Sequence, residues 1–299
     1  MKHITSKNIS CSAATIALGN FDGLHLGHQA LIRECARVGG TVAVFSFAPH
    51  PSSVLAGVPF KTILTSEEKA LLLEKMGVDL FIEYPFDEEI ANMPPERFVG
   101  DILAGQLNAS SVAVGEDYRF GKGGRGDCEL LCELGGRFGF AVKIIPHVTD
   151  NGSKISSSRV REAVTEKDFG EAHRLMGRSY FVMGEVVRGN LIGRGIGVPT
   201  ANLVPDAYKL LPPPGVYRSQ VLLEGESFTG MTNIGTRPTV TKSDDIVVET
   251  HLLDFDDDIY GKIITVEFCE WIRQEKRFNS LDELREQLMK DILAVRDKA

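Results

Sequence analysis

The stretch "ATIALGNFDGLHLGHQALI", residues 14–32, carries the first fold signal of the chain. Its opening "ATIAL" is a continuous apolar run that predicts a buried strand, and "HQALIRECARVG", residues 28–39, has the spacing of an amphipathic helix. A glycine-rich turn with two histidines joins them. A buried strand that leads directly into a helix predicts the first unit of an α/β fold.

The turn itself suggests phosphate chemistry. His25 and His28 stand at the start of the predicted helix with Gly27 between them. Amides at a helix start favour anions, glycine lets the backbone approach a ligand, and histidines can donate hydrogen bonds to a phosphate. Two ordinary polar loop residues, or a metal pair at i, i+3, are the alternatives.

The alternation continues over the first half of the chain. Buried strands are expected at 41–47, 78–84, 110–115 and 140–148, and helices at 65–77, 95–107 and 128–139. Thr65 and Glu68 are spaced as a capping box for the first of these helices. The pattern predicts a parallel, Rossmann-like sheet covered on both faces, with ligands beyond the carboxyl ends of its strands.

The second half is β-rich. The turn "DNGSK" and two short helices, 156–164 and 168–177, lead into strand-like runs after Tyr180. These runs predict an antiparallel barrel or sandwich. The chain ends in a predicted helix that Ser280 and Glu283 cap, and its apolar stripe is expected to pack on the barrel; the stripe comprises Leu281, Leu284, Leu288, Ile292 and Val295.

Composition narrows the class of protein. The chain has 299 residues and a net charge of -8, which disfavours nonspecific nucleic-acid binding. There is no apolar run long enough for a membrane span and no apolar signal core at the start, so we expect a cytoplasmic protein. Its five scattered cysteines are expected to be reduced, buried thiols, and the i, i+4 pair Cys128 and Cys132 has poor zinc spacing.

A second phosphate signal is "KISSSRVREAV", residues 154–164. Serine hydroxyls and free amides at a helix start suit phosphate oxygens, and an arginine can fork onto them. Simple helix capping is the alternative. Two further loops follow predicted strands: "SFAPHP", which holds His50 between prolines, and "GEDYRFG", which is dense in polar and aromatic residues. The adjoining "GKGGRG" lacks the spacing of a P-loop.

The β-rich half has its own candidate site. "GRGIGVPTANL", residues 193–203, is a glycine-rich loop whose amides can wrap phosphates, and Thr200 and Asn202 offer oxygen ligands for magnesium. Glu249 lies among hydrophobic residues of a predicted strand, where a partly desolvated carboxylate can act as a base. An ordinary turn and a solvent-facing strand residue are the alternatives.

Together these motifs resemble the bacterial bifunctional riboflavin kinases and FAD synthetases from about Ile16 to Ile292. "HLGH" and "ISSSRVR" resemble the H-x-G-H and I-S-S-T-x-I-R signatures of nucleotidyltransferases, and "VGEDYRFG" is similar to V-G-x-D-F-R-F-G. "VPTAN", "NIGTRPT" and "ETHLLDF" are similar to riboflavin kinase motifs. Lys167 and Val198 stand where the family usually has glycine and phenylalanine.

The resemblance implies two reactions: riboflavin and ATP give FMN, and FMN and ATP give FAD and pyrophosphate. It implies an adenylyltransferase domain at 1–178 and a kinase domain, an antiparallel barrel closed by the last helix, at 179–299. Substrates would be riboflavin, FMN and ATP with Mg²⁺; neither nucleic acid nor membrane is expected as a partner, and no oligomer is implied.

It also implies roles for individual residues. Glu249 would be the catalytic base of the kinase, and His25 and His28 would be catalytic in adenylyl transfer. Thr200 and Asn202 would hold the metal. The implied phosphate-binding residues of the first half are Gly19, Phe21, Asp22, Gly27, Ser156, Ser157 and Arg161; those of the flavin or nucleotide loops are His50, Asp117, Arg119 and Phe120; those of the kinase loop are Gly193, Gly195, Gly197 and Pro199.

Three rival interpretations remain at this point: a different H-x-G-H nucleotidyltransferase, a flavin-binding regulator without catalysis, and a zinc protein that uses His25, His28 and His50.

Overall fold

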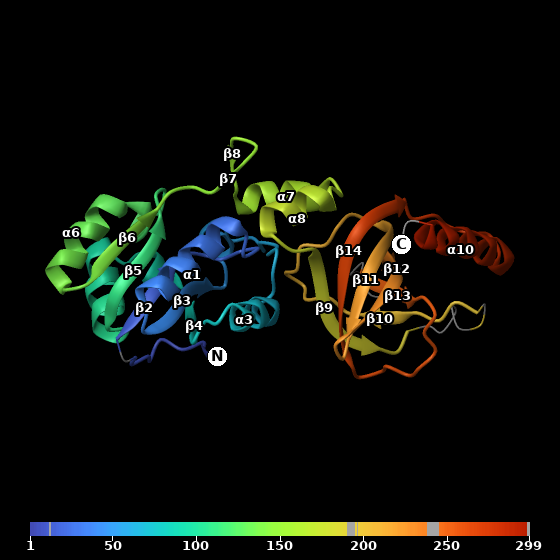
Figure 1. The fold of residues 1–299 in the computed structure, drawn as a ribbon, viewed down its shortest axis with the longest axis horizontal. Coiled ribbons are helices and arrows are strands. Elements are labelled where there is room, and N and C mark those ends of the chain that lie inside the picture. The colour runs from blue at the N-terminus through green and yellow to red at the C-terminus, as the bar shows by residue number, and fades with distance from the viewer. Residues whose placement is uncertain (12, 190–194, 196, 238–244, 298–299) are drawn as a thin grey trace. The chain divides into compact units, whose positions relative to one another are not determined.

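The computed structural model describes residues 1–297 except 12, 190–194, 196 and 238–244. By their internal contacts the residues form two compact units, Met1–Ser157 and Ser158–Ala299, and each is described by itself. Figure 1 shows an α/β layer arrangement in the first and a barrel in the second. The predicted functional boundary at residue 178 stays a prediction.

The first unit is built on a six-stranded sheet whose strand pairs are all parallel, in the order β1-β4-β3-β2-β5-β6. The Rossmann-like parallel sheet is therefore confirmed. Its central strands are continuous apolar runs because helices cover both faces. The strands are β1 (Lys2–Ile4), β2 (Ala14–Leu18), β3 (Thr41–Ala48), β4 (Leu80–Pro85), β5 (Ala109–Gly115) and β6 (Ala141–Ile145).

The helices predicted from the apolar periodicity are present with one exception, and further short helices at 51–56, 88–91 and 122–124 were not predicted. They are α1 (Leu26–Val38), α2 (Pro51–Ala56), α3 (Ser66–Lys75), α4 (Glu88–Ala91), α5 (Pro95–Arg97), η1 (Phe98–Gln106), η2 (Lys122–Gly124) and α6 (Cys128–Phe138). The capping box of Thr65 and Glu68 at α3 is confirmed. The α-helix predicted at 95–107 is wrong in type, because after one α turn the chain continues as a π-helix.

In that π-helix the amide of Leu107 bonds to the carbonyl oxygen of Ile102, five residues back, at 2.9 Å. Two glycines lie within the segment. A Cβ on Gly100 would come 2.9 Å from the ring of Phe138, and one on Gly105 would come 3.1 Å from the carbonyl oxygen of Gly100. The spacing of apolar residues does not distinguish an α-helical turn from a π-helical turn, so the π-helix could not be predicted from it.

The second unit is centred on a closed six-stranded antiparallel barrel, in the order β10-β13-β12-β11-β14-β9, as the kinase resemblance implied. A chain of hydroxyls joins Ser219, Thr232 and Thr250 at 2.7 and 2.9 Å, and all three side chains are fully buried. The strands are β9 (Tyr180–Val187), β10 (Ala201–Leu203), β11 (Gly215–Leu223), β12 (Glu226–Arg237), β13 (Asp245–Leu252) and β14 (Ile263–Arg273).

Among the described residues, the helices that accompany the barrel are α7 (Ser157–Thr165), α8 (Phe169–Met176) and α10 (Leu281–Arg296). Phe169 of α8 packs against Tyr217 and Phe268. The predicted turn "DNGSK" is confirmed, with Asn151 and Gly152 at positive φ between β7 (Thr149–Asp150) and β8 (Ser153–Lys154).

The terminal helix differs in detail from the prediction. Ser280 caps it, but the carboxylate of Glu283 accepts from the amide of Asn279 at 3.1 Å, one residue before the cap. Leu288, Ile292 and Val295 pack in an apolar cluster with barrel residues, as predicted. Leu281 does not, because it stands in the first turn and remains 61% exposed.

The cysteines are free thiols, as expected, but they are not all buried. Cys35 is buried, and burial raises the pKa of its thiol to about 12. Cys132 is exposed, because it lies on the outer face of α6. Cys11, Cys128 and Cys269 are partly buried, so the expectation of buried thiols is confirmed only for Cys35 and is wrong for Cys132.

Candidate active sites

The histidine turn caps α1. The Nδ1 atom of His25 accepts a hydrogen bond from the backbone amide of His28 at 3.3 Å. An imidazole that accepts at Nδ1 carries its ring proton on Nε2, so the cap fixes His25 as an Nε2–H donor. The rings of His25 and His28 are stacked with their centroids 3.7 Å apart.

The space left by Gly27 is used by a side chain. A Cβ on Gly27 would come 3.1 Å from both Nδ1 and Cε1 of the His25 ring. The small residue between the two histidines therefore admits the capping imidazole. Its predicted role in admitting a phosphate stays a prediction.

Phe21 and Asp22 are buried residues of the turn that precedes α1. Phe21 is fully buried at φ 50°, and Asp22 is 4% exposed. The Asp22 carboxylate accepts from the amide of Ile63 at 2.7 Å, and its carbonyl accepts from the hydroxyl of Ser157 at 2.7 Å. Neither Phe21 nor Asp22 lines a described cavity of this unit.

A polar cavity of about 260 Å³ opens in front of the histidines. It brings together residues that follow three strands of the sheet, β2, β5 and β6, as the parallel topology requires. Ser156 and Ser157 line it, so the two nucleotidyltransferase signatures meet. The remaining polar and glycine lining comprises Gly19, His25, Gly27, His28, Gly115, Asp117, His147 and Lys154.

Two of these residues, His147 and Lys154, were not predicted. His147 is half-buried and its Nδ1 lies 3.5 Å from a carboxylate oxygen of Glu116. Lys154 forms a close ion pair with Asp117. The pKa of Asp117 is lowered: partial burial raises it, but the hydrogen bond and charge of Lys154 outweigh the burial.

A larger and more apolar cavity, about 450 Å³, adjoins the polar one. Gly19, Asp117 and Tyr118 line both. Its aromatic walls suit a flat ring system, and Arg119 stands at its rim, exposed and 3.4 Å from Asp127. The aromatic lining comprises Phe45, Phe47, Phe86, Phe98, Tyr118 and Phe120.

Two predicted residues lie elsewhere. His50 does not line this cavity; its ring caps α2 through the amide of Ser52 and stacks on Phe60 with centroids 4.2 Å apart. Arg161 lies on α7, half-buried, among residues of the second unit.

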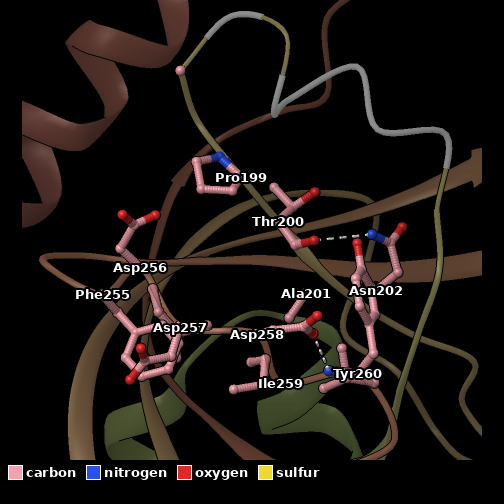
Figure 2. Close-up of a pocket in the computed structure, with 13 residues that line it drawn as sticks. Pro199, Thr200, Ala201, Asn202, Phe255, Asp256, Asp257, Asp258, Ile259 and Tyr260 are labelled. Carbon is pink, nitrogen blue, oxygen red and sulfur yellow. Dashed lines mark hydrogen bonds between the residues drawn. The ribbon is translucent and has the colours of Figure 1, made fainter.

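In the barrel, the "VPTAN" segment lines a cavity of about 300 Å³ (Figure 2). Gly197, Pro199, Thr200 and Asn202 line it, whereas Gly195 does not, and Gly193 lies outside the described residues. The opposite wall was missed from the sequence: it is the acidic loop Asp256, Asp257 and Asp258 with Tyr260.

Asn202 is held closely. It is 6% exposed, and its amide nitrogen donates to the carbonyl oxygen of Thr200 at 3.2 Å (Figure 2). A Cβ on Gly189 would come 2.6 Å from the amide atoms of Asn202, so only glycine fits against it. Two side-chain oxygens beside one cavity suit a hard cation such as Mg²⁺.

Glu249, on β13, forms a row with one residue of each neighbouring strand. It pairs with Asn202 of β10 on one side and with Asn233 of β12 on the other. Directly opposite residues of antiparallel strands project on the same face, so these side chains lie together. Thr250, the next residue, points into the barrel; Glu249 points outward and is half-buried.

Glu249, Asn233 and Thr200 line a second barrel cavity of about 270 Å³. Thr200 is common to both cavities of this unit. Another wall is formed by residues near the C-terminus, none of which was predicted to belong to a site. They are Arg273, Glu275, Lys276, Phe278, Leu284 and Leu288. Val198, where the family usually has phenylalanine, is 1% exposed and lines the same cavity.

A buried ion pair holds that wall in place. Arg273 of β14 donates three hydrogen bonds of 2.6 to 3.0 Å to the carboxylate of Asp291 on α10. Asp291 is 3% exposed and also accepts from Gln287 at 2.9 Å. The pair fixes α10 against the strand that ends at this cavity.

Lys167, the other departure from the family pattern, has φ 64°, the left-handed conformation that glycine favours. Its ammonium group lies 4.8 Å from the centroid of the Trp271 ring. A cation–π contact of this kind stabilises the lysine in a conformation that glycine adopts without strain.

A parallel-sheet unit with a histidine-lined cavity, followed by a barrel with its own cavity beside the P-T-A-N segment, is the arrangement expected of a two-domain transferase. Comparison agrees: the FAD synthetase family matches residues 7–159, and the riboflavin kinase family matches residues 176–299. The chain belongs to the bifunctional riboflavin kinase/FMN adenylyltransferase family.

Relatives of that description cover nearly the whole chain. The Escherichia coli K12 protein is 39% identical over 94% of this chain and 91% of its own length. The Bacillus subtilis protein is 36% identical over 93% and 90%. The crystal structure of a macrolide-efflux protein from Streptococcus pneumoniae is 32% identical, covers 98% of both chains and has a TM-score of 0.86.

Two of the rivals lose support. Within the described residues, no three His, Cys, Asp or Glu side chains gather as a metal site would require, so His25, His28 and His50 form no zinc centre there. The riboflavin kinase match separates the chain from other H-x-G-H nucleotidyltransferases. Among the described helices, none combines the length and apolar character needed to span a bilayer.

Proposed function

We propose that the chain converts riboflavin to FMN at the barrel and FMN to FAD at the histidine-lined cavity, each with ATP. One observation carries this assignment: in each unit a polar cavity adjoins a second cavity, and shared residues line both. Gly19 and Asp117 are shared in the first unit, and Thr200 in the second. A nucleotide phosphate in one cavity and a flavin in the next would meet at the shared residues.

In adenylyl transfer the nucleophile is a phosphate oxygen of FMN, already an anion, so no protein base is required. Its attack on the α-phosphorus of ATP forms the new P–O bond as the bond to pyrophosphate breaks. His25, an Nε2–H donor, and His28 would donate to the α-phosphate as charge accumulates. Ser156 and Ser157, which line the cavity, would hold the departing pyrophosphate.

In the kinase reaction Glu249 would accept the proton of the riboflavin 5′-hydroxyl while that oxygen attacks the γ-phosphorus and ADP leaves. The outward position of Glu249, in the cavity that α10 closes, suits this role. Phosphoryl transfer depends mainly on positioning and electrostatics, so one base and a phosphate loop suffice.

We propose Mg²⁺ as the metal, with Thr200 and Asn202 as its protein ligands. When bound with ATP, it would neutralise charge on the phosphate oxygens. We further propose that the enzyme is cytoplasmic, because free thiols suit a reducing compartment. We also propose that its adenylyltransferase domain ends near residue 178.

The test is a time course with riboflavin, ATP and Mg²⁺, with the flavins separated by chromatography. We expect FMN to rise first and FAD to follow. FMN alone would contradict the assignment of the histidine cavity. FAD that appears only when FMN is supplied would contradict the assignment of the barrel.

A further inference from the structure

A histidine outside the P-T-A-N segment, residues 199–202, forms a hydrogen bond to its backbone. The Nδ1 atom of His251, on β13, lies 2.7 Å from the carbonyl oxygen of Pro199. A carbonyl oxygen only accepts, so the imidazole nitrogen is the donor. His251 is half-buried, and burial lowers the pKa of its imidazole despite the opposing hydrogen bond to Pro199.

The register of the barrel explains why an anchor is needed there. Strand β10 pairs with β13 from Ala201 opposite Thr250 onward, and continuing this register would place Thr200 opposite His251. The pairing stops at Ala201, and Pro199 has no amide hydrogen to extend it. The side chain of His251 thus replaces a missing backbone bond one residue before Thr200.

We propose that His251 is a positioning residue of the kinase site, which sets Thr200 and Asn202 for the nucleotide and its metal. This inference rests on the proposed function, because it assumes that the P-T-A-N segment binds Mg²⁺ and ATP. His251 lines neither of the two barrel cavities described above, and it acts through the Pro199 carbonyl oxygen.

Two replacements separate the hydrogen bond from the bulk of the ring. His251→Asn keeps an N–H donor at the position of Nδ1, whereas His251→Leu fills the space without a donor. His173→Leu, at an exposed position of α8, is the matched control. We expect His251→Leu to raise the KM for Mg·ATP in riboflavin phosphorylation about 10-fold or more, since misplacement by about 1 Å can cost about 100-fold. The KM for riboflavin should change little.

A binding measurement avoids dependence on turnover. Mg·ADP is the product of the kinase alone, because adenylyl transfer releases pyrophosphate, and its affinity can be measured by calorimetry. We expect about 10-fold weaker binding for His251→Leu and near wild-type binding for His251→Asn and His173→Leu. FAD formation from supplied FMN should be unchanged in all three.

Two results would overturn the inference. One is wild-type Mg·ADP affinity and kinetics in His251→Leu. The other is equal loss in His251→Leu and His251→Asn together with a lower thermal unfolding transition, which would make the contact merely structural. Failure of the proposed function is distinct, since then the wild-type chain itself would form no FMN.

Discussion

The two units bring the residues of their proposed sites together by different means. In the parallel sheet they come from loops that follow separate strands, and His25 is placed by a helix cap. In the barrel the row Asn202, Glu249 and Asn233 is placed by strand register. The comparison teaches that loops set the geometry of one centre and a hydrogen-bonded ladder sets that of the other.

The largest effect is expected when the carboxylate of Glu249, in the row of Asn202, Glu249 and Asn233, is replaced. Glu249→Gln keeps the side-chain shape but not the base, and general bases contribute about 100- to 10,000-fold to rate. FMN formation should fall by about that factor, while FMN-to-FAD conversion in the same sample continues. Retained FMN formation would remove Glu249 from the mechanism.

The corresponding change in the loop-built centre is His28→Ala. Loss of one charge-stabilising donor costs about 100- to 1,000-fold. FAD formation from FMN should fall by that factor, and phosphorylation of riboflavin should be unaffected, with both followed by chromatography. Loss of both activities in a folded protein would mean that the two centres are not separate.

One wall of the barrel cavity proposed to bind flavin is held by the ion pair between Arg273 and Asp291. Asp291→Ala leaves Arg273 without its partner, and breaking a buried pair costs about 3 kcal/mol. Thermal unfolding of the barrel should move to lower temperature and the KM for riboflavin should rise. Glu286→Ala, at an exposed position of the same helix, is the control. An unchanged KM would separate α10 from riboflavin binding.

Glycine replacements compare the two designs directly. In Gly189→Ala the new Cβ would come 2.6 Å from the amide of Asn202, so that amide must move. We expect about 100-fold slower riboflavin phosphorylation, because a 1 Å displacement has effects of that size. Gly170→Ala, where the nearest contact is an ordinary 3.4 Å, is the control.

The smallest effect is expected for Gly27→Ala. Its Cβ would come 3.1 Å from the His25 ring, and a side chain on a loop can yield a few tenths of an ångström. FAD formation should fall about 10-fold, less than the loss in Gly189→Ala. Gly136→Ala, with open space around it, serves as control. If Gly27→Ala lost more activity than Gly189→Ala, the loop-built site would be the less tolerant of the two, contrary to our expectation.

The sequence predicted well those features that repeat along the chain. Buried parallel strands are continuous apolar runs, and the α3 capping box has fixed spacing, so both were predictable. The π-helix at 98–106 has the same apolar period as an α-helix over so short a segment. The exposure of Leu281 depends on where the barrel ends, which local periodicity does not contain.

The site was predictable where residues fall within motifs. His25, His28, Ser156 and Ser157 meet in one cavity as the signatures suggested. His147 and Lys154 were missed because single charged residues in loops form no pattern.

Contacts between distant residues were missed for a related reason. Gly189 touches Asn202 and Arg273 pairs with Asp291 only in the folded chain.

Thr200 borders both barrel cavities, of about 300 and 270 Å³. Under the proposed assignment, an inhibitor that joins a flavin-like ring to a nucleoside phosphate through a short linker would span both cavities. Such a molecule would gain from the connection itself, since the second half binds at high effective concentration once the first is seated. The shared threonine thus marks where the linker of a bisubstrate inhibitor belongs.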